Sequence, residues 1–430
     1  MADKPIIEVT GRLEKRRSGT GKKLIYRMMF SYTDEYGDLQ RFSETTGLSV
    51  TKGNQRKAEK LLNEKIKEHE AQLINEILFM QRRKNGEIPV TDLMEEWLES
   101  VNPLTNKKNK TGIKLNTFGG YQTNIQKYVA PWFHKRGIML CDLTADHINN
   151  FYDDMLESLK ATSIHKFHAN ISKALKYAVR KGYIDSARII MERVNRPKAE
   201  KFYGKFLRQS EVEELYEAVK GHKLELGVLL GAYYGLRRSE IVGLRWESIN
   251  FENDTITIEH TVTMATVNGE CIISADDTTK NRSSLRTLPL TPVLRAKLLS
   301  VQAEQEHYRK LCGRSFNKEE SKYIYTDTLG NRIKPGYLTG QFPVFLKKNG
   351  FRHIRFHDLR HSCASLLLAN GVSLKQIQDW LGHSTFKTTA DTYAHLESDS
   401  KLAAAAALTW INNTSLAQDA NDAQMMANVS

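Results

Sequence analysis

The chain has 430 residues, a formal net charge of +13 at pH 7 and four cysteines. This length allows two or three domains, and no run of apolar residues approaches the roughly 18 that are needed to cross a bilayer. The cysteines are scattered without a CxxC pair, which argues against a disulfide framework and against a thiolate metal site. We therefore expect a cytoplasmic protein that does not enter a membrane.

Lysine and arginine occur in every segment of the chain and are not gathered in a tail. An excess of this size suits a polyanionic partner, because the release of counterions from nucleic acid would supply much of the affinity. The same charge is compatible with a basic protein that binds no nucleic acid. The motifs along the chain have to decide between the two.

Residues 6–47 alternate short apolar runs with turn signals, which predicts three antiparallel strands joined by two hairpins. A small basic sheet can place one face in a DNA groove, although the same charges also suit the solvated face of a structural sheet. The basic residues on the first two predicted strands and their turn are Arg12, Lys15, Arg16, Arg17, Lys22, Lys23 and Arg27. A charged helix is expected next at 55–83, and Gly86 and Pro89 mark a domain boundary.

Between residue 90 and about residue 193 the patterns predict only helices, which form a compact four-helix bundle. Three basic residues of the last helix, Lys166, Lys173 and Arg180, recur at helical spacing. They form a ridge that suits phosphates, or else an ordinary solvated face. The basic segment ERVNRPKAEKFYGKF, which contains Pro197, is typical of a linker to a third domain.

The third region begins with a helix capped at Ser210 and passes through a small antiparallel sheet, in which Asn268-Gly269 is a hairpin signal. From Pro292 to about Asn412 the patterns predict helices. Within this part, Gly371 can end one helix, and Ser373 with Gln376 forms a capping box that opens the next. The last 18 residues, 413–430, are polar, and we expect a mobile tail.

The third region also holds side chains that suit chemistry on phosphate. Two arginines can hold a phosphate bidentately, a lysine can donate a proton to a leaving oxygen, and histidines can take or stabilise protons near neutral pH. A tyrosine can act as the nucleophile and form a covalent phosphoryl intermediate. This set needs no metal and no cofactor. The candidates are Arg237 or Arg238, Lys280, His357, Arg360, His383 and Tyr393.

The motifs GLRRSEIVGLRW, TTKNRSSLRTLPL, HDLRH, LGH and TYAH, in this order, resemble those of the tyrosine recombinases, specifically the phage and conjugative-transposon integrases. The resemblance is strong over residues 207–395 and weaker for the N-terminal sheet, which is similar to the arm-type DNA-binding domains of such integrases. It places the six catalytic positions of the family on Arg237, Lys280, His357, Arg360, His383 and Tyr393. The family has its first arginine directly after Gly-Leu, which selects Arg237, and its fifth position varies between His and Trp.

The resemblance implies a multidomain fold. We expect a small three-stranded β-sheet plus helix that binds arm DNA at 1–85, an all-α helical bundle that binds core DNA at 86–195, and a mainly-α catalytic domain with a small antiparallel β-sheet at 196–412. It also implies a site-specific integrase of a mobile element that works as a homo-tetramer on double-stranded DNA in a bacterial host cell. Tyr393 would form a 3′-phosphotyrosyl link without ATP or metal, and an excisionase or a host DNA-bending protein would be further partners.

Three alternatives remain at this point. His357 and His361 have the i, i+4 spacing of a zinc peptidase motif, but Arg360 would repel the metal, and we expect His361 and His395 to be structural. A DNA-binding repressor would have no use for a lysine general acid. A type IB topoisomerase shares the tyrosine chemistry, but it acts without pairing two sites, and the predicted arm-binding sheet favours recombination.

Overall fold

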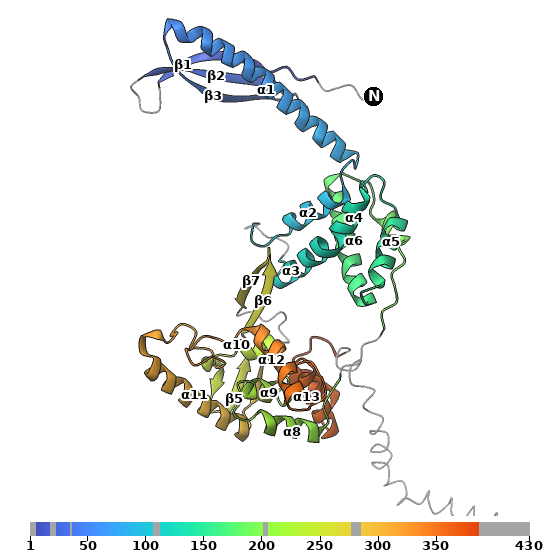
Figure 1. Cartoon of the computed structure of the whole chain (residues 1–430), viewed down its shortest axis with the longest axis vertical. Helices are drawn as coiled ribbons and strands as arrows, with labels where there is room; N and C mark the ends of the chain where they lie inside the picture. The colour runs from blue at the N-terminus through green and yellow to red at the C-terminus, as the bar shows by residue number, and fades with distance from the viewer. Residues whose placement is uncertain are drawn as a thin grey trace, which may run out of the picture. The chain divides into compact units, whose positions relative to one another are not determined.

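The computed structural model describes residues 6–17, 23–34, 37–105, 112–200, 205–276 and 285–386. The chain forms two compact units, residues 1–200 and 201–430 (Figure 1). Among the described residues, none of the helices combines the length and the hydrophobicity that crossing a membrane requires. The predicted catalytic residues Lys280 and Tyr393, the basic residue Lys22, His395 and the predicted tail lie outside the described residues.

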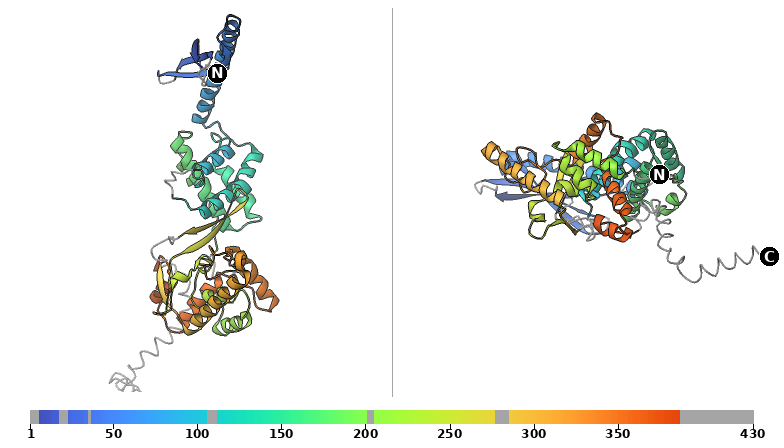
Figure 2. Two further views of the ribbon diagram at one scale, coloured as in Figure 1. Left: turned by 90° about the vertical axis from the view of Figure 1, so that its left-hand side faces the viewer. Right: turned by 90° about the horizontal axis from the view of Figure 1, so that it is seen from below.

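The first unit begins with an antiparallel sheet of three strands, as predicted. The strands are β1 (Thr10–Arg17), β2 (Leu24–Thr33) and β3 (Leu39–Ser49), in the order β1-β2-β3. Helix α1 (Lys52–Lys84) runs along this sheet (Figures 1 and 2). Alternate residues of β2, from Tyr26 to Phe30, are buried, and Met28 and Phe30 form a small core with Leu62 of α1. Because side chains alternate across a strand, this core leaves the other face of the sheet open.

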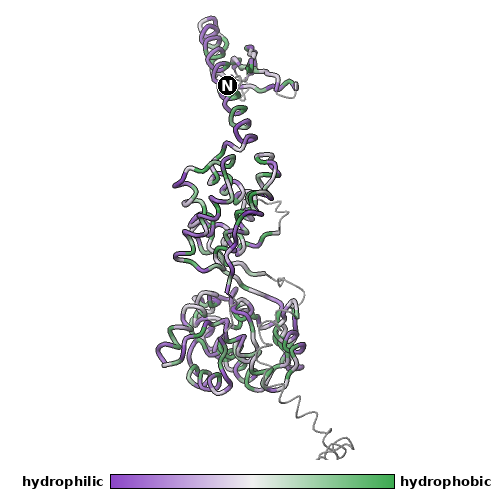
Figure 3. Tube along the Cα trace, turned by 90° about the vertical axis from the view of Figure 1, so that its right-hand side faces the viewer, coloured by the Kyte–Doolittle hydropathy of each residue, from purple (hydrophilic) through white to green (hydrophobic). Residues whose placement is uncertain are grey.

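The rest of the first unit is a helical bundle. Its elements are α2 (Val90–Ser100), α3 (Leu115–Asn124), a π-helical turn η1 (Ile125–Val129), α4 (Ala130–Arg136), α5 (Ala145–Leu156), α6 (Ala161–Lys181) and the short α7 (Arg188–Glu192). The four predicted helices correspond to α2, the continuous run from α3 to α4, α5 and α6. Their apolar faces meet in a core in which Phe151, Phe167 and Ile171 are almost completely buried. Figure 3 shows the resulting mixture of hydrophobic and hydrophilic residues along each helix.

The second unit is mainly helical. Its helices are α8 (Gln209–Val219), α9 (Glu225–Ala232), α10 (Arg238–Gly243), the 3-10 turns η2 (Trp246–Ser248) and η4 (Gly313–Ser315), α11 (Pro292–Cys312), α12 (Pro335–Lys348), α13 (Asp358–Ala369) and α14 (Leu374–Leu381). Every residue of α9 is buried, so this helix forms the centre of the unit. The capping box of Ser373 and Gln376 opens α14 as predicted, and Gly371 follows the end of α13 with a φ of 79°.

The described strands of the second unit form two sheets, whereas the sequence led us to expect one. Strands β4 (Ile249–Asn250), β5 (Thr255–Ile258) and β8 (Arg286–Pro289) form one antiparallel sheet, while β6 (Thr261–Val267) and β7 (Glu270–Asp276) form a separate hairpin. The hairpin turns at Asn268 and Gly269, as predicted, and both residues have positive φ. The separation has a local cause at Gly243, because a Cβ there would lie 2.9 Å from the Cα of Thr261. The missing side chain lets β6 pass against the end of α10 and leave the first sheet.

The prediction of helices throughout the part after Pro292 is wrong for residues 316–334. This segment forms turns and two isolated β-bridges. Asp327 accepts hydrogen bonds from the backbone of Leu329 and Asn331, both at 2.9 Å. Asp and Asn side chains that bond to the nearby backbone compete with helix formation, which explains the error.

Candidate active site

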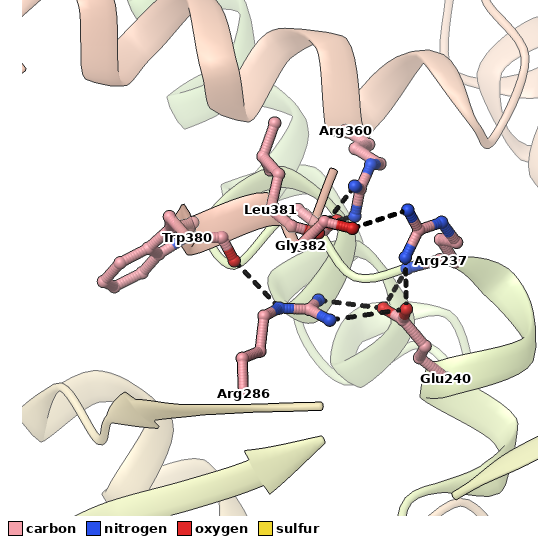
Figure 4. Close-up of polar contacts among 8 residues, drawn as sticks. Arg237, Glu240, Arg286, Arg360, Trp380, Leu381 and Gly382 are labelled. Atoms are coloured by element: carbon pink, nitrogen blue, oxygen red, sulfur yellow. Dashed lines mark hydrogen bonds and ion pairs between the residues drawn. The ribbon is translucent and has the colours of Figure 1, made fainter. Parts of the chain in front are cut away.

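Residues 380–382, where α14 ends, each offer a carbonyl oxygen to a different arginine (Figure 4). Arg286 Nε donates to the carbonyl oxygen of Trp380 at 2.8 Å. Arg360 Nη2 donates to that of Leu381 at 2.6 Å, and Arg237 Nη2 donates to that of Gly382 at 3.1 Å. The last carbonyls of a helix have no partner within the helix and carry its partial negative charge. Gly382 has a φ of 68°, which turns the chain away and leaves these oxygens free to accept. The end of α14 therefore gathers three guanidinium groups.

Glu240 lies between two of these arginines and is 1% exposed. Its Oε1 lies 2.6 Å from Nη1 of Arg237, and its Oε2 lies 2.9 Å from Nη2 of Arg286. Burial acts to raise the pKa of Glu240, but the positive charges of Arg286 and Arg237 outweigh burial and lower the pKa to about 2. The carboxylate is ionised at neutral pH and fixes both guanidinium groups.

The turn between α9 and α10 places Arg237 at this site. Gly235 has a φ of 63°, and a Cβ at this residue would collide with Leu381. The carbonyl oxygen of Gly235 accepts a hydrogen bond from Nη1 of Arg360 at 2.5 Å. Arg237 then caps α10, with its backbone N–H donating to Glu240 at 2.9 Å. The glycine, the cap and the arginine cluster are thus parts of one local structure.

The cluster carries more positive than negative charge. Two guanidiniums, those of Arg237 and Arg286, bind the carboxylate of Glu240, and the third, that of Arg360, binds the carbonyl of Leu381 beside them. The three differ in exposure. The side chain of Arg237 is 33% exposed, while that of Arg286 is 6% exposed and Arg360 is 2% exposed. The guanidinium of Arg237 has five N–H donors, and its contacts with Glu240 and the carbonyl oxygen of Gly382 use only some of them. An anion such as a phosphodiester would find charge and directed donors at Arg237.

His357 precedes the first residue of α13 and adds a titratable group. Its ring lies across that of His361, with the centroids 5.5 Å apart and the planes at 86°. Partial burial, together with His361 and Arg360, lowers the pKa of His357 from 6.5 to about 4. The imidazole is therefore neutral at pH 7 and able to accept a proton. Within the described ranges, no group of three His, Cys, Asp or Glu side chains is arranged to hold a metal ion.

His383 follows the glycine that ends α14. Its backbone N–H donates to the carbonyl oxygen of Gln378 at 3.1 Å, and its own carbonyl accepts from the side-chain amide of Gln378 at 3.1 Å. Burial, with the positive charges of Arg360 and Arg237 adding to it, lowers the pKa of His383 from 6.5 to about 3. These two hydrogen bonds hold the neutral imidazole of His383 beside the arginine cluster.

The structure distinguishes Arg237 from its neighbour Arg238, whereas helical periodicity alone could not choose between them. Arg237 joins the cluster, whereas Nη1 of Arg238 donates to Thr339 Oγ1 on α12 at 3.0 Å. Arg237, His357, Arg360 and His383 share the region around the end of α14 and the start of α13. The remaining two predicted catalytic residues, Lys280 and Tyr393, belong to segments that the structure does not describe.

Sequence reasoning missed Glu240 and Arg286. Glu240 stands three residues after the helix cap at Arg237, which is the glutamate position of a capping box. Arg286 and Leu288 are the buried residues of β8, and Thr287 between them is exposed. A buried arginine in an alternating strand requires an acidic partner, so the two residues could have been linked by this argument.

The basic residues of the N-terminal sheet divide between its two faces. Residues that pair directly across antiparallel strands lie on the same face, and Lys15 pairs with Tyr26 on the α1 side. Arg17 shares that side with Lys15, and Lys23 is exposed just before β2. The basic residues of the open face are Arg12, Arg16, Arg27 and Arg41, the last of which sequence reasoning missed.

Lys166, Lys173 and Arg180 are exposed at intervals of seven residues along α6. Lys173 donates to the hydroxyl of Tyr121, and its ammonium lies 4.4 Å from the centroid of that ring. This contact holds the charge of Lys173 at a fixed place on the surface. The three residues, which we call the α6 stripe, lie along one side of the helix, as the spacing predicted.

Both units are similar to known proteins. The model of the phage integrase family matches residues 205–399, and the model of the phage integrase SAM-like domain matches residues 96–190. A tyrosine recombinase XerC-like protein of Caldanaerobacter subterraneus subsp. tengcongensis is 27% identical over 321 residues, which are 72% of this chain and 80% of that protein. The ICEBs1 integrase of Bacillus subtilis is 25% identical over 336 residues, which are 76% of this chain and 85% of that protein.

Two solved structures share the fold. The Tn1549 transposon integrase in complex with transposon right end DNA has a TM-score of 0.58 and 18% identity, over 74% of this chain and 99% of that one. A lambda integrase tetramer bound to a Holliday junction has a TM-score of 0.51 and 19% identity, over 88% of this chain and 94% of that one.

Proposed function

This chain belongs to the phage integrase family of tyrosine recombinases, and we propose that its arginine cluster holds the DNA phosphate at which strands are cut. The enzyme is a site-specific DNA recombinase of a mobile element. The observation that carries the proposal is the set of three guanidiniums anchored to residues 380–382 beside two neutral histidines. A cluster of this kind stabilises the extra charge of a phosphoryl transition state.

In the proposed reaction, the phenol oxygen of Tyr393 attacks the scissile phosphorus, and the bond to the 5′-oxygen breaks. The proton of Tyr393 passes to His357, and Lys280 donates a proton to the departing 5′-oxygen. His383 donates a hydrogen bond to a non-bridging oxygen. The product is a 3′-phosphotyrosyl link, and attack by the 5′-hydroxyl of a partner strand reverses each step. The phosphodiester energy is conserved in the covalent link, so neither ATP nor a metal ion is used.

DNA contacts are proposed for both parts of the first unit. The bundle, assigned to 86–195, would contact core DNA through the α6 stripe of Lys166, Lys173 and Arg180, and the open face of the sheet, within 1–85, would bind separate arm sites. Arginines that replace counterions on DNA produce a steep dependence on salt. The solved complexes of similar integrases with DNA, one of them a tetramer, support double-stranded DNA as the partner and a homo-tetramer as the working form. An excisionase or a host DNA-bending protein would direct the reaction in the bacterial cytoplasm.

The test of the catalytic proposal is a nicked core-site duplex incubated with the full chain in EDTA and run on a denaturing gel. We expect a covalent protein–DNA adduct that disappears in Tyr393→Phe, with DNA binding retained. Cleavage that needs a metal and leaves no adduct would overturn the proposal. Relaxation of plasmids without a specific site would instead indicate a topoisomerase, and a salt-sensitive footprint without cleavage would indicate a DNA-binding protein.

The test of the sheet is a double variant, Arg12→Ala with Arg16→Ala, compared with Lys15→Ala with Arg17→Ala on the other face. The first pair should weaken arm-site binding and reduce the salt dependence by about one to two counterions, and the second pair should have a smaller effect. Equal effects of both pairs would contradict the assignment of the open face.

A further inference from the structure

The last turn of α1 is joined to the helical bundle by a polar network around Glu96 of α2. Arg83 Nη1 lies 2.5 Å from Oε2 of Glu96. The hydroxyl of Tyr177, on α6, donates to Oε1 of Glu96 at 2.8 Å, and that of Tyr183, just after α6, donates to the same oxygen at 2.9 Å. One carboxylate thus receives three donors from α1, α6 and the segment behind α6.

The side chains of this network are shielded from water. That of Arg83 is 20% exposed and that of Glu96 is 23% exposed. The guanidinium of Arg83 also lies 4.5 Å from the centroid of the Phe79 ring, one turn back on α1, and donates to the hydroxyl of Tyr183 at 3.1 Å. A charged pair at this level of burial, with further hydrogen bonds on both partners, is stronger than an exposed surface pair.

The backbone after α1 is also held by the bundle. Gly86 has a φ of 69°, and its carbonyl oxygen accepts from the N–H of Cys141 at 2.9 Å. Ile88 accepts from Leu140 at 2.8 Å, and Pro89 forms a β-bridge with Met139. The sequence pattern around Gly86 predicted a domain boundary, yet this segment is tied to the bundle by hydrogen bonds.

We infer that Glu96 is a positioning residue that couples the N-terminal sheet to the core-binding bundle, so that DNA bound by the sheet changes the rate of cleavage at the core site. This inference rests on the proposed function of the sheet. Few contacts connect the sheet with the bundle. Helix α1 packs on the sheet through Leu62 and Ile66, and Arg83 in its last turn binds Glu96. Tyr177 carries the contact into α6, the helix that presents Lys166, Lys173 and Arg180. If α1 were loosely attached, DNA bound by the sheet would have no rigid element through which to act.

The test compares two DNA substrates: the natural attachment site of the mobile element, and the same DNA in which all sequence outside the core site is replaced. The measured quantity is the ratio of the adduct-formation rates on the two substrates. We expect a ratio above 1 for the wild type, and a ratio reduced about 5-fold or to 1 in Glu96→Gln. The rate on core-only DNA should stay within about 2-fold of wild type, because the hydrogen bonds of Glu96 within the described residues are with Arg83, Tyr177 and Tyr183 and not with the basic residues of the α6 stripe.

The control is Asp154→Asn in the same bundle. Asp154 also receives an arginine and an aromatic donor, Arg136 at 2.8 Å and Trp132 at 2.7 Å, but neither of these comes from α1. In Asp154→Asn the ratio of the two adduct-formation rates should remain at the wild-type value. Arg83→Ala is the second test variant, since it removes the α1 side of the network while both tyrosines still donate to Glu96, so the bundle keeps its internal contacts.

The outcomes are distinguishable. A wild-type ratio of 1 would overturn the coupling, and a footprint on the natural attachment site would then show separately whether the sheet binds arm DNA. A wild-type ratio above 1 that persists in both Glu96→Gln and Arg83→Ala would overturn the coupling and leave arm binding intact. Loss of the ratio in Asp154→Asn as well would show a general loosening of the bundle and would also overturn the role given to Glu96. Combining Arg83→Ala with Glu96→Gln should add no further loss, because both act on one contact.

Discussion

Arg237 and Arg360 donate to the carbonyl oxygens of adjacent residues, Gly382 and Leu381, although they lie on different elements far apart in the sequence. The spacing of the two guanidiniums is therefore set by one peptide unit at the end of α14. A shift of α14 would move both groups together.

Substitution of Glu240 by Gln should destabilise the second unit and slow DNA cleavage. Glu240→Gln keeps the shape but removes the charge that neutralises Arg286 and Arg237, which leaves a buried guanidinium without its counterion. Breaking a buried pair in this way costs about 3–5 kcal/mol. Thermal unfolding and the rate of adduct formation measure the two effects. The control is Glu213→Gln on the exposed face of α8, which should change neither; equal behaviour of the two variants would contradict the role of Glu240.

The stability of the protein should fall as the pH is lowered below about 6.5. The pKa of His357 falls from 6.5 to about 4 and that of His383 to about 3 on folding, so the unfolded chain takes up protons that the folded chain refuses. Their contribution is complete above pH 6.5 and is lost as the pH falls through these values. Glu240, with a pKa lowered to about 2, adds a loss below about pH 4.5. Melting temperatures measured from pH 7.5 to pH 4 check this order.

The double variant His357→Gln with His383→Gln provides the control for the acid range. It removes the two groups that refuse protons, so its melting temperature should depend less on pH between 6.5 and 4.5 than that of the wild type. A wild-type melting temperature that stays constant over this interval would show that the two imidazoles are not shielded in the folded state.

The two neighbouring arginines at the start of α10 should differ sharply in function. Arg237→Ala removes a guanidinium from the cluster and should reduce adduct formation by about 100-fold or more, in the range seen when one preorganised donor is lost. Arg238→Ala removes only the contact with Thr339 on α12 and should leave the rate within a few-fold of wild type. Similar losses in both variants would mean that the helix start, and not the guanidinium of Arg237, is what matters.

The sequence was most informative where local rules decide the structure. The hairpin at Asn268, the capping box at Ser373 and the three antiparallel N-terminal strands follow from preferences of a few residues each, and the structure confirms each of them. The helices of the bundle were equally clear, because their apolar periodicity is long. The family resemblance came from ordered motifs and was confirmed by the family models.

The interior of the candidate site was not accessible in the same way. Glu240 and Arg286 lie within two of the quoted motifs, and local rules indicate a cap and a buried arginine, but their contact with each other depends on β8 passing next to α10. The acceptor role of residues 380–382 is a property of backbone carbonyls, which no side-chain pattern encodes. Helices were expected at 316–334 as part of the helical region predicted after Pro292, but the bonds of Asp327 to the backbone favour a turn.

The first described residues of the second unit are bound to α13, the helix that carries Arg360. Arg352 holds the same residues, and we therefore predict a role for it. Arg352 pairs with Glu211 at 2.6 Å and donates to the carbonyl oxygen of Phe206. The next backbone N–H, that of Leu207, donates to the buried hydroxyl of Ser362 on α13 at 2.9 Å. The linker from the first unit therefore ends on the same helix as Arg360. Arg352→Ala should release this end and lower the cleavage rate at saturating DNA by about 10-fold, with a smaller change in DNA affinity.

Arg295→Ala is the matched control for this variant. Arg295 also joins a carboxylate and a backbone carbonyl, Asp254 and Phe251, both at 2.9 Å, and its side chain is 38% exposed against 45% for Arg352. It lies away from the linker, so its loss should lower the melting temperature by a similar amount without a comparable loss of cleavage. If both variants lose cleavage rate only in proportion to their loss of melting temperature, Arg352 has a structural role alone. A loss of cleavage rate that is larger in Arg352→Ala than in Arg295→Ala would show that the end of the linker helps to position α13.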